Sequence, residues 1–170
     1  MAARLLLLDS NVIIDYSAAD RGVLTLVWRH VGLIHIPSVL LKEVGDLDQS
    51  ECDRLGLVVV EPAVELLAAA GKRRPGLSFN DHVCLLAAKA AGWTCVTNDN
   101  RLRRECKVEK VAVLWGLEMM VPLVAGRHLS VSAARGVAEA IHAANPMYVT
   151  KEIVRQFEKR ITKAAGGRKE

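Results

Sequence analysis

The sequence predicts an α/β fold: a three-layer α/β/α sandwich built on a parallel five-stranded sheet and followed by a C-terminal helical extension. Short apolar runs alternate with helical patterns as far as residue 125, which is the order of elements found in parallel sheets. The first run, RLLLL at residues 4–8, is typical of a strand buried on both faces. The 170 residues, 51% of them hydrophobic, suffice for one domain with a substantial core.

The predicted elements follow one another in a regular order. Strands are predicted at residues 4–8, 33–36, 57–60, 93–97 and 111–114. Helices are predicted to begin after Asp9, at Pro37, at Pro62, at Ser78 and at Asn100, with an apolar helix at residues 117–124 and a polar helix or loop at residues 46–55. Two further helical patterns, at residues 130–144 and 150–161, form the extension. We therefore expect an α/β domain, residues 1–125, and C-terminal helices, residues 126–170, that pack on the same domain or at a dimer interface.

The segment at residues 77–106 carries the clearest local signals. Ser78 with Asp81 three residues later is typical of a capping box, in which both side chains accept hydrogen bonds from free backbone N–H groups. Apolar residues then recur at helical spacing until Gly92, which is expected to end the helix. Asp99 lies just past the strand that follows. One acid is thus predicted in the first turn of a helix and another at the carboxyl end of a strand, the edge where open α/β sheets bind ligands.

Four acidic residues occupy positions from which they can meet at this edge. Asp9 and Asp99 each lie where a buried strand gives way to a helix, and Glu43 and Asp81 lie on helices that can reach the same cleft. Crowded carboxylates repel one another, and a hard cation such as Mg²⁺ or Mn²⁺, which prefers oxygen ligands, would offset that repulsion. Taken singly, each acid could equally be a helix cap or a surface charge. The joint pattern predicts a metal site.

Other polar residues complete the predicted site. Asn11 and Thr97 are expected to orient the carboxylates or bound waters. The candidates for binding a phosphate backbone are the basic residues nearest the acids in the sequence, namely Arg73, Arg74, Arg101, Arg103 and Arg104. A solvated basic loop is the alternative for Arg73 and Arg74. The five histidines show no metal-ligand spacing, so no histidine is expected to serve as the base.

Composition argues against several other kinds of site. The four cysteines include no CxxC pair, so we expect reduced structural thiols and neither a zinc site nor a disulfide framework. The apolar run at residues 5–8 is too short to span a bilayer and lacks a signal-peptide body, so we expect a cytoplasmic protein without membrane contact. The formal net charge of +4 is concentrated in residues 151–170, which fits nucleic-acid binding and a solvated helix face equally well.

Four segments together resemble the PIN-domain nucleases and, among them, the VapC-type toxins of prokaryotic toxin–antitoxin pairs. They are LLLLDSNVII at residues 5–14, VLLKEV at residues 39–44, LSFNDHVCLLAAKAAG at residues 77–92 and TCVTNDNRLRREC at residues 94–106. The resemblance implies the sheet order 3-2-1-4-5, which places the strands preceding Asp9 and Asp99 side by side. It also implies that Asp9, Glu43, Asp81 and Asp99 are the catalytic, metal-binding acids, with Thr97 as an accompanying polar residue.

The function implied by the resemblance is that of a Mg²⁺- or Mn²⁺-dependent endoribonuclease that leaves 5′-phosphate and 3′-hydroxyl ends, as the toxin of a toxin–antitoxin pair. The implied partners are an RNA substrate and an antitoxin that inserts a basic side chain into the acidic cleft. The apolar helices at residues 117–124 and 153–161 are expected to serve a homodimer or that antitoxin. Two alternatives keep the fold: a PIN nuclease of RNA processing without an antitoxin, and a catalytically inactive module that binds RNA or a protein partner.

A phosphoacceptor receiver domain is another parallel α/β fold with clustered acids. It expects a phosphorylated Asp after the third strand and a Lys after the fifth. Here the third strand ends in Glu61 and Pro62, and the fifth in Trp115 and Gly116. The sequence therefore argues against a receiver domain.

Overall fold

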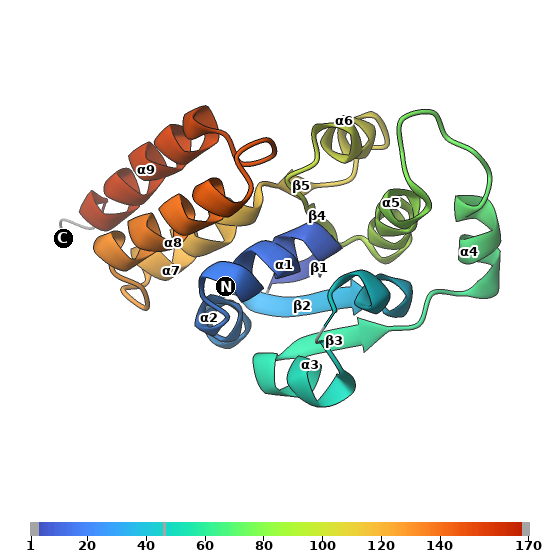
Figure 1. Ribbon diagram of the computed structural model, residues 1–170, viewed down its shortest axis with the longest axis horizontal. Coiled ribbons are helices and arrows are strands. Elements are labelled where there is room, and N and C mark those ends of the chain that lie inside the picture. Colours follow the sequence, from blue (N-terminus) through green and yellow to red (C-terminus); the bar gives the residue numbers. More distant parts are fainter. Residues whose placement is uncertain (1–3, 46, 168–170) are drawn as a thin grey trace.

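The computed structural model describes residues 4–45 and 47–167, and within them five parallel strands form one sheet in the order β3-β2-β1-β4-β5 (Figure 1). The strands are β1 (Arg4–Leu8), β2 (Gly32–Pro37), β3 (Leu57–Val60), β4 (Thr94–Val96) and β5 (Val113–Leu114). The predicted α/β class, the parallel sheet and its strand order are confirmed. Because β1 is the central strand, Leu6, Leu7 and Leu8 are at most 1% exposed.

Helices flank the sheet and connect its strands (Figure 1). The helices before β4 are α1 (Ser10–Ala19), α2 (Gly22–His30), the 3-10 helix η1 (Ser38–Glu43), α3 (Gln49–Leu55), α4 (Val64–Ala70) and α5 (Phe79–Ala91). Those after β4 are α6 (Asn100–Val108), the 3-10 helix η2 (Gly116–Met119), α7 (Met120–Ala125), α8 (Val131–Ala144) and α9 (Lys151–Gly166). The sequence patterns predict all of these segments except α2, whose first turn has no side-chain cap.

Two segments differ in detail from the predicted elements. Pro37 does not open an α-helix; it ends β2, where it pairs with Val60 of β3, and the following segment is the short 3-10 helix η1. Gly45, with a φ of +65°, turns the chain soon after it, so there is no room for a longer helix. In the polar segment at residues 46–55, the side chain of Asp48 accepts a hydrogen bond from the backbone of Glu51 and begins α3, whereas Asp46 lies outside the described residues.

Helix α5 begins and ends where the sequence predicts. The Ser78 hydroxyl accepts a hydrogen bond from the Asp81 backbone N–H at 3.1 Å, and the Asp81 carboxylate accepts one from the Ser78 N–H at 2.9 Å. The predicted capping box is therefore present. Gly92 has a φ of +67°, the left-handed conformation that ends a helix and favours glycine. These two ends fix which residues of α5 face the sheet and which face the carboxyl edge.

The C-terminal helices pack on the α/β body. Helix α8 lies against α1, and α9 lies against α7 and α8 (Figure 1). The apolar stripe predicted for α9 is internal, with Phe157 2% exposed and Ile161 fully buried. Arg160 of α9 also forms an ion pair with Glu118 of η2. The buried part of the stripe therefore packs within this chain.

The buried cysteines and histidines belong to the core. All four cysteines are buried free thiols. The ring nitrogen Nδ1 of His82 lies 3.1 Å from the carbonyl of Ala70, and that of His35 lies 3.0 Å from the carbonyl of Leu6. Neither histidine faces the predicted site. Within the described residues, no helix combines the length and apolar character needed to cross a membrane.

Candidate acidic site at the carboxyl edge of the sheet

Asp9 forms the floor of the candidate site. It follows β1, and because Leu8 pairs with Val96 of β4, Asp9 and Thr97 are the next residues on two adjacent strands. The Asp9 backbone N–H continues this pairing, with a hydrogen bond to the Val96 carbonyl at 3.0 Å. Although Asp9 is the N-cap residue of α1, its carboxylate makes no capping hydrogen bond. The side chain, 2% exposed, is thus free for another role.

Thr97 connects two of the acids. Its hydroxyl donates a hydrogen bond to Oδ2 of Asp9 at 2.9 Å and accepts one from the backbone N–H of Asp99 at 3.0 Å. Thr97 is fully buried, so this geometry is held by the surrounding core. Thr97 therefore contacts Asp9 as the sequence leads one to expect. Asn11 does not, because it is exposed on α1, about 100° around the helix from Ser10.

Ser10 and Asn80 make the contacts with the carboxylates that were expected of Asn11. The Ser10 hydroxyl lies 2.5 Å from Oε2 of Glu43 and 3.4 Å from Oδ1 of Asp9. A hydroxyl has one proton, and the shorter contact to Glu43 is the stronger hydrogen bond. The Asn80 amide donates to the other oxygen of Glu43, also at 2.5 Å. Both residues are sequence neighbours of predicted acids, which is the signal that could have identified them.

Asp81 and Asp99 act as helix caps and still face the cleft. The hydrogen bonds to Asp99 go to Oδ1, from the N–H groups of Arg101 at 2.7 Å and Leu102 at 3.0 Å. The one to Asp81 goes to Oδ2. Within residues 4–45 and 47–167, neither the second oxygen of Asp81 nor that of Asp99 accepts a side-chain or capping hydrogen bond. Each acid therefore combines a structural role with one oxygen that is open to a ligand.

The electrostatics show that the four acids share one environment. Burial raises the pKa of Asp9 from 3.8 to about 6. The hydrogen bond from Thr97 opposes this rise in the pKa of Asp9, and the negative charges of Asp81, Asp99 and Glu43 add to it. All three other acids are thus close enough to repel charge on Asp9. A bound cation would stabilise the ionised form of an acid in such surroundings.

The carboxylates do not form a ready-made cage. In the described part of the chain, no three His, Cys, Asp or Glu side chains are arranged to hold a metal ion as they stand. Each of the four instead accepts hydrogen bonds from its own surroundings, Glu43 and Asp99 from two donors each. The set offers carboxylate and hydroxyl oxygens without nitrogen or sulfur, which suits Mg²⁺ or Mn²⁺. A bound cation would therefore have to bring at least three of these carboxylates closer together than they lie without it.

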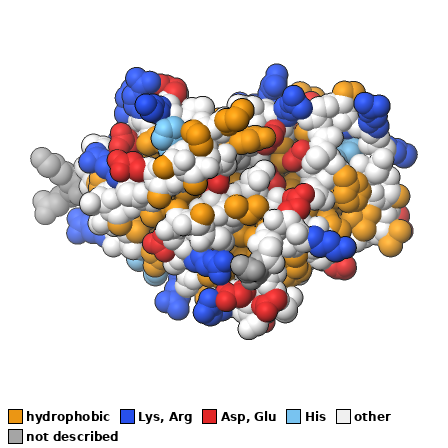
Figure 2. All heavy atoms as spheres, viewed as in Figure 1, with side chains coloured by type: hydrophobic (Ala, Val, Ile, Leu, Met, Phe, Trp, Pro, Cys, Tyr) orange, Lys and Arg blue, Asp and Glu red, His pale blue; other side chains and the backbone are white. Residues whose placement is uncertain are grey.

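Four of the five predicted arginines line a cleft beside the acids, and three of them are exposed. The cleft has a volume of about 800 Å³, and its lining includes Asp81 and Asp99 together with Arg73, Arg101 and Arg104. All three arginines are exposed. On the face shown in Figure 2, some acidic side chains lie near the centre, while others lie toward the edges together with most of the cationic ones. A phosphate chain in this cleft would contact arginines while passing the acids.

Arg103 does not belong to this set. It is 8% exposed, its guanidinium carbon lies 3.7 Å from the ring centre of Trp115, and Nη1 donates to the Thr97 carbonyl at 3.3 Å. Burial lowers the pKa of Arg103. The prediction that Arg103 binds the phosphate backbone is therefore wrong. Its position, three residues before the buried Cys106 on α6, turns it inward to brace the strand end that carries Thr97.

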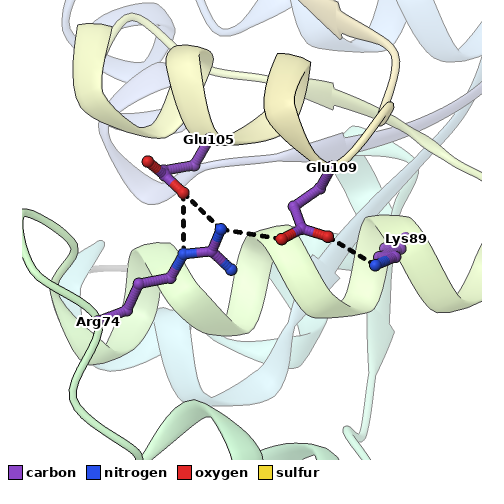
Figure 3. Close-up of polar contacts among 4 residues, drawn as sticks. All are labelled: Arg74, Lys89, Glu105 and Glu109. Atoms are coloured by element: carbon purple, nitrogen blue, oxygen red, sulfur yellow. Dashed lines mark hydrogen bonds and ion pairs between the residues drawn. The ribbon is translucent and has the colours of Figure 1, made fainter.

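Arg74 lines the cleft but is occupied by an ion-pair network (Figure 3). Its Nε donates to Glu105 at 2.8 Å and its Nη2 to Glu109 at 2.9 Å, and Lys89 binds the other oxygen of Glu109 at 2.6 Å. Hydrogen bonds from Lys89 and Arg74 lower the pKa of Glu109 to about 2. Arg74 thus fastens the loop before α5 to α6, and its contact with a phosphate backbone stays a prediction.

Comparison with models of known protein families and with curated proteins finds no match for this chain. The resemblance to the PIN-domain nucleases therefore stays a prediction from the sequence.

Proposed function

We propose that this chain is a Mg²⁺- or Mn²⁺-dependent ribonuclease that hydrolyses phosphodiester bonds at the acidic site. The observation that carries the proposal is the buried Asp9 carboxylate, which makes no capping hydrogen bond to α1 and whose pKa is raised by burial and by three neighbouring acids. Such an arrangement costs stability unless a cation binds there. The adjoining cleft supports a phosphate-containing substrate, because exposed arginines line it beside Asp81 and Asp99.

Each residue of the site would have a separate role in the reaction. Asp9, Glu43, Asp81 and Asp99 would hold the divalent ion, which when bound supplies Lewis-acid activation of water and offsets negative charge on the phosphate. Thr97 keeps the Asp9 carboxylate in place, and Ser10 and Asn80 position Glu43. Arg73, Arg101 and Arg104 would bind the RNA backbone. The resemblance to VapC-type toxins extends the proposal to a toxin whose partner protein inserts a basic side chain among the acids.

The proposal predicts that the purified chain cleaves RNA only when a divalent cation is present. We expect cleavage in Mg²⁺ or Mn²⁺, none in EDTA, and products with 5′-phosphate and 3′-hydroxyl ends. The measurement is gel analysis of an end-labelled RNA, followed by chemical identification of the new ends. Binding of RNA without metal-stimulated cleavage would instead favour the catalytically inactive binding module. Products with 2′,3′-cyclic phosphate ends would contradict hydrolysis by a metal-activated water.

The neighbouring residues Arg73 and Arg74 are expected to differ sharply when each is replaced by alanine. Arg73→Ala should weaken RNA binding severalfold and reduce its salt dependence by about one phosphate contact, because Arg73 is exposed in the cleft. Arg74→Ala should instead lower the melting temperature by a few degrees, because it breaks the network with Glu105 and Glu109. Titration of RNA at several salt concentrations and thermal unfolding measure the two effects. Identical behaviour of the two variants would contradict this division.

A further inference from the structure

The loop between α8 and α9 forms one wall of the cleft. Met147 and Tyr148 lie far from the acids in the sequence, yet they line the same cleft as Asp81 and Asp99. The Met147 side chain is 87% exposed, and the aromatic side chain of Tyr148 is 44% exposed. Figure 2 shows hydrophobic side chains at the surface in the region where Figure 1 places this loop. The C-terminal extension therefore contributes directly to the cleft.

The loop is held at three points, so its exposed side chains are presented on a fixed backbone. Asn145 donates a hydrogen bond to Oδ1 of Asp15 at 3.1 Å. The side chain of Val149 is fully buried, and its carbonyl lies 2.6 Å from Nδ1 of His142. The backbone N–H groups of Tyr148 and Val149 both bond to the Asn145 carbonyl. A ligand that stacks on Tyr148 would therefore meet a wall that is already ordered.

The same contacts connect the loop to the acidic site. The second oxygen of Asp15 accepts a hydrogen bond from the Asn98 amide at 3.0 Å, and Asn98 in turn accepts one from the Gly116 N–H at 2.9 Å. Asn98 stands between Thr97 and Asp99, and both Asn98 and Asp15 are buried. The position of Tyr148 is thus fixed relative to the acids through two buried polar side chains.

We propose that Tyr148, with Met147 beside it, is a stacking platform for an unpaired base of single-stranded RNA whose phosphates are held by the arginines of the cleft. This inference rests on the proposed ribonuclease function and assigns Tyr148, in the loop between α8 and α9, a role in recognising the substrate. Alternating cationic and aromatic contacts are how proteins bind single strands, because every base has a face that can stack on a ring. In a duplex the base faces are covered by neighbouring base pairs, so Tyr148 would have nothing to stack on.

The test is RNA binding in EDTA, where no cleavage occurs. Binding is measured by the fluorescence anisotropy of a short labelled single strand. Tyr148→Ala is expected to weaken binding about 5- to 100-fold, and Tyr148→Phe, which keeps the ring, should remain within about twofold of the natural chain. A duplex of the same sequence should bind more weakly and be insensitive to Tyr148→Ala. Circular dichroism verifies that the variants are folded.

Trp28→Ala is the matched control. Trp28 is 40% exposed and lines a second basic cleft, of about 960 Å³, with Arg29 and Lys163 at the opposite end of the strands. Its loss should leave binding unchanged. Unaltered binding by Tyr148→Ala, a loss with Tyr148→Phe equal to that with alanine, or a larger loss with Trp28→Ala would each overturn the proposal. Since these measurements need no metal, absent cleavage by the natural chain would refute the ribonuclease alone.

Discussion

Replacing Asp9 by asparagine is expected to lower metal-dependent RNA cleavage more than about 100-fold while leaving the chain folded. Among the four acids Asp9 is the most deeply buried, at 2% exposure, and it is held by the buried hydroxyl of Thr97. Asparagine retains the size of the side chain and an oxygen that can accept the Thr97 hydrogen bond. It removes the negative charge that attracts a cation and replaces one carboxylate oxygen by an amide NH₂ group. Initial rates at saturating Mn²⁺ measure the loss, and circular dichroism verifies the fold.

Glu65→Gln provides the control for this prediction. Glu65 is an exposed acid in the first turn of α4, outside the lining of the cleft, and its replacement removes the same charge. The Glu65 variant should cleave at the natural rate. If Asp9→Asn retained metal-stimulated cleavage near the natural rate, Asp9 would have no role in holding the ion, and the central part of the proposed mechanism would fail.

The sequence predicts the frame of the site better than the direction of its side chains. Apolar runs and helix signals suffice to place Asp9 and Asp99 at the ends of strands, because those patterns reflect burial and backbone geometry. Whether an N-cap aspartate caps its helix is decided by what lies on the adjacent strand. Asp99 caps α6, whereas Asp9 turns to Thr97 because β1 and β4 pair with Leu8 opposite Val96. This register depends on the pairing of two strands that are far apart in the sequence, so no local pattern reveals it.

The directions of the arginine side chains were also not predicted from the sequence, although one of them could have been. Arg101, Arg103 and Arg104 form one basic run in the sequence, yet only Arg103 is buried, where it stacks on Trp115. Its spacing of three residues from the apolar Cys106 places both on one face of α6, a pattern available in the sequence. The capture of Arg74 by two glutamates of α6 and the arrival of Tyr148 at the cleft depend on contacts between distant segments. No local pattern predicts such contacts.

The stability of the metal-free chain is expected to depend on pH through Asp9. Its pKa rises from 3.8 to about 6 on folding, so the folded state binds this proton more tightly than the unfolded state does. The contribution of Asp9 to stability is therefore fully present below pH 4 and is lost as the pH rises through about 6. Between pH 4 and pH 8 the natural chain should lose about 2–3 kcal/mol relative to Asp9→Asn, which has no proton to release.

Urea unfolding of both proteins in EDTA at the two pH values measures this difference. Titrating groups that do not interact with Asp9, such as Glu109 with its pKa of about 2, act equally in both proteins and cancel in the comparison. A stability difference that is the same at pH 4 and pH 8 would contradict the raised pKa of Asp9. Adding Mn²⁺ at pH 8 should then stabilise the natural chain, by about 2.7 kcal/mol at a concentration of 100 times Kd, and leave Asp9→Asn unchanged. The same buried charge that weakens the metal-free fold would thus be what the ion binds.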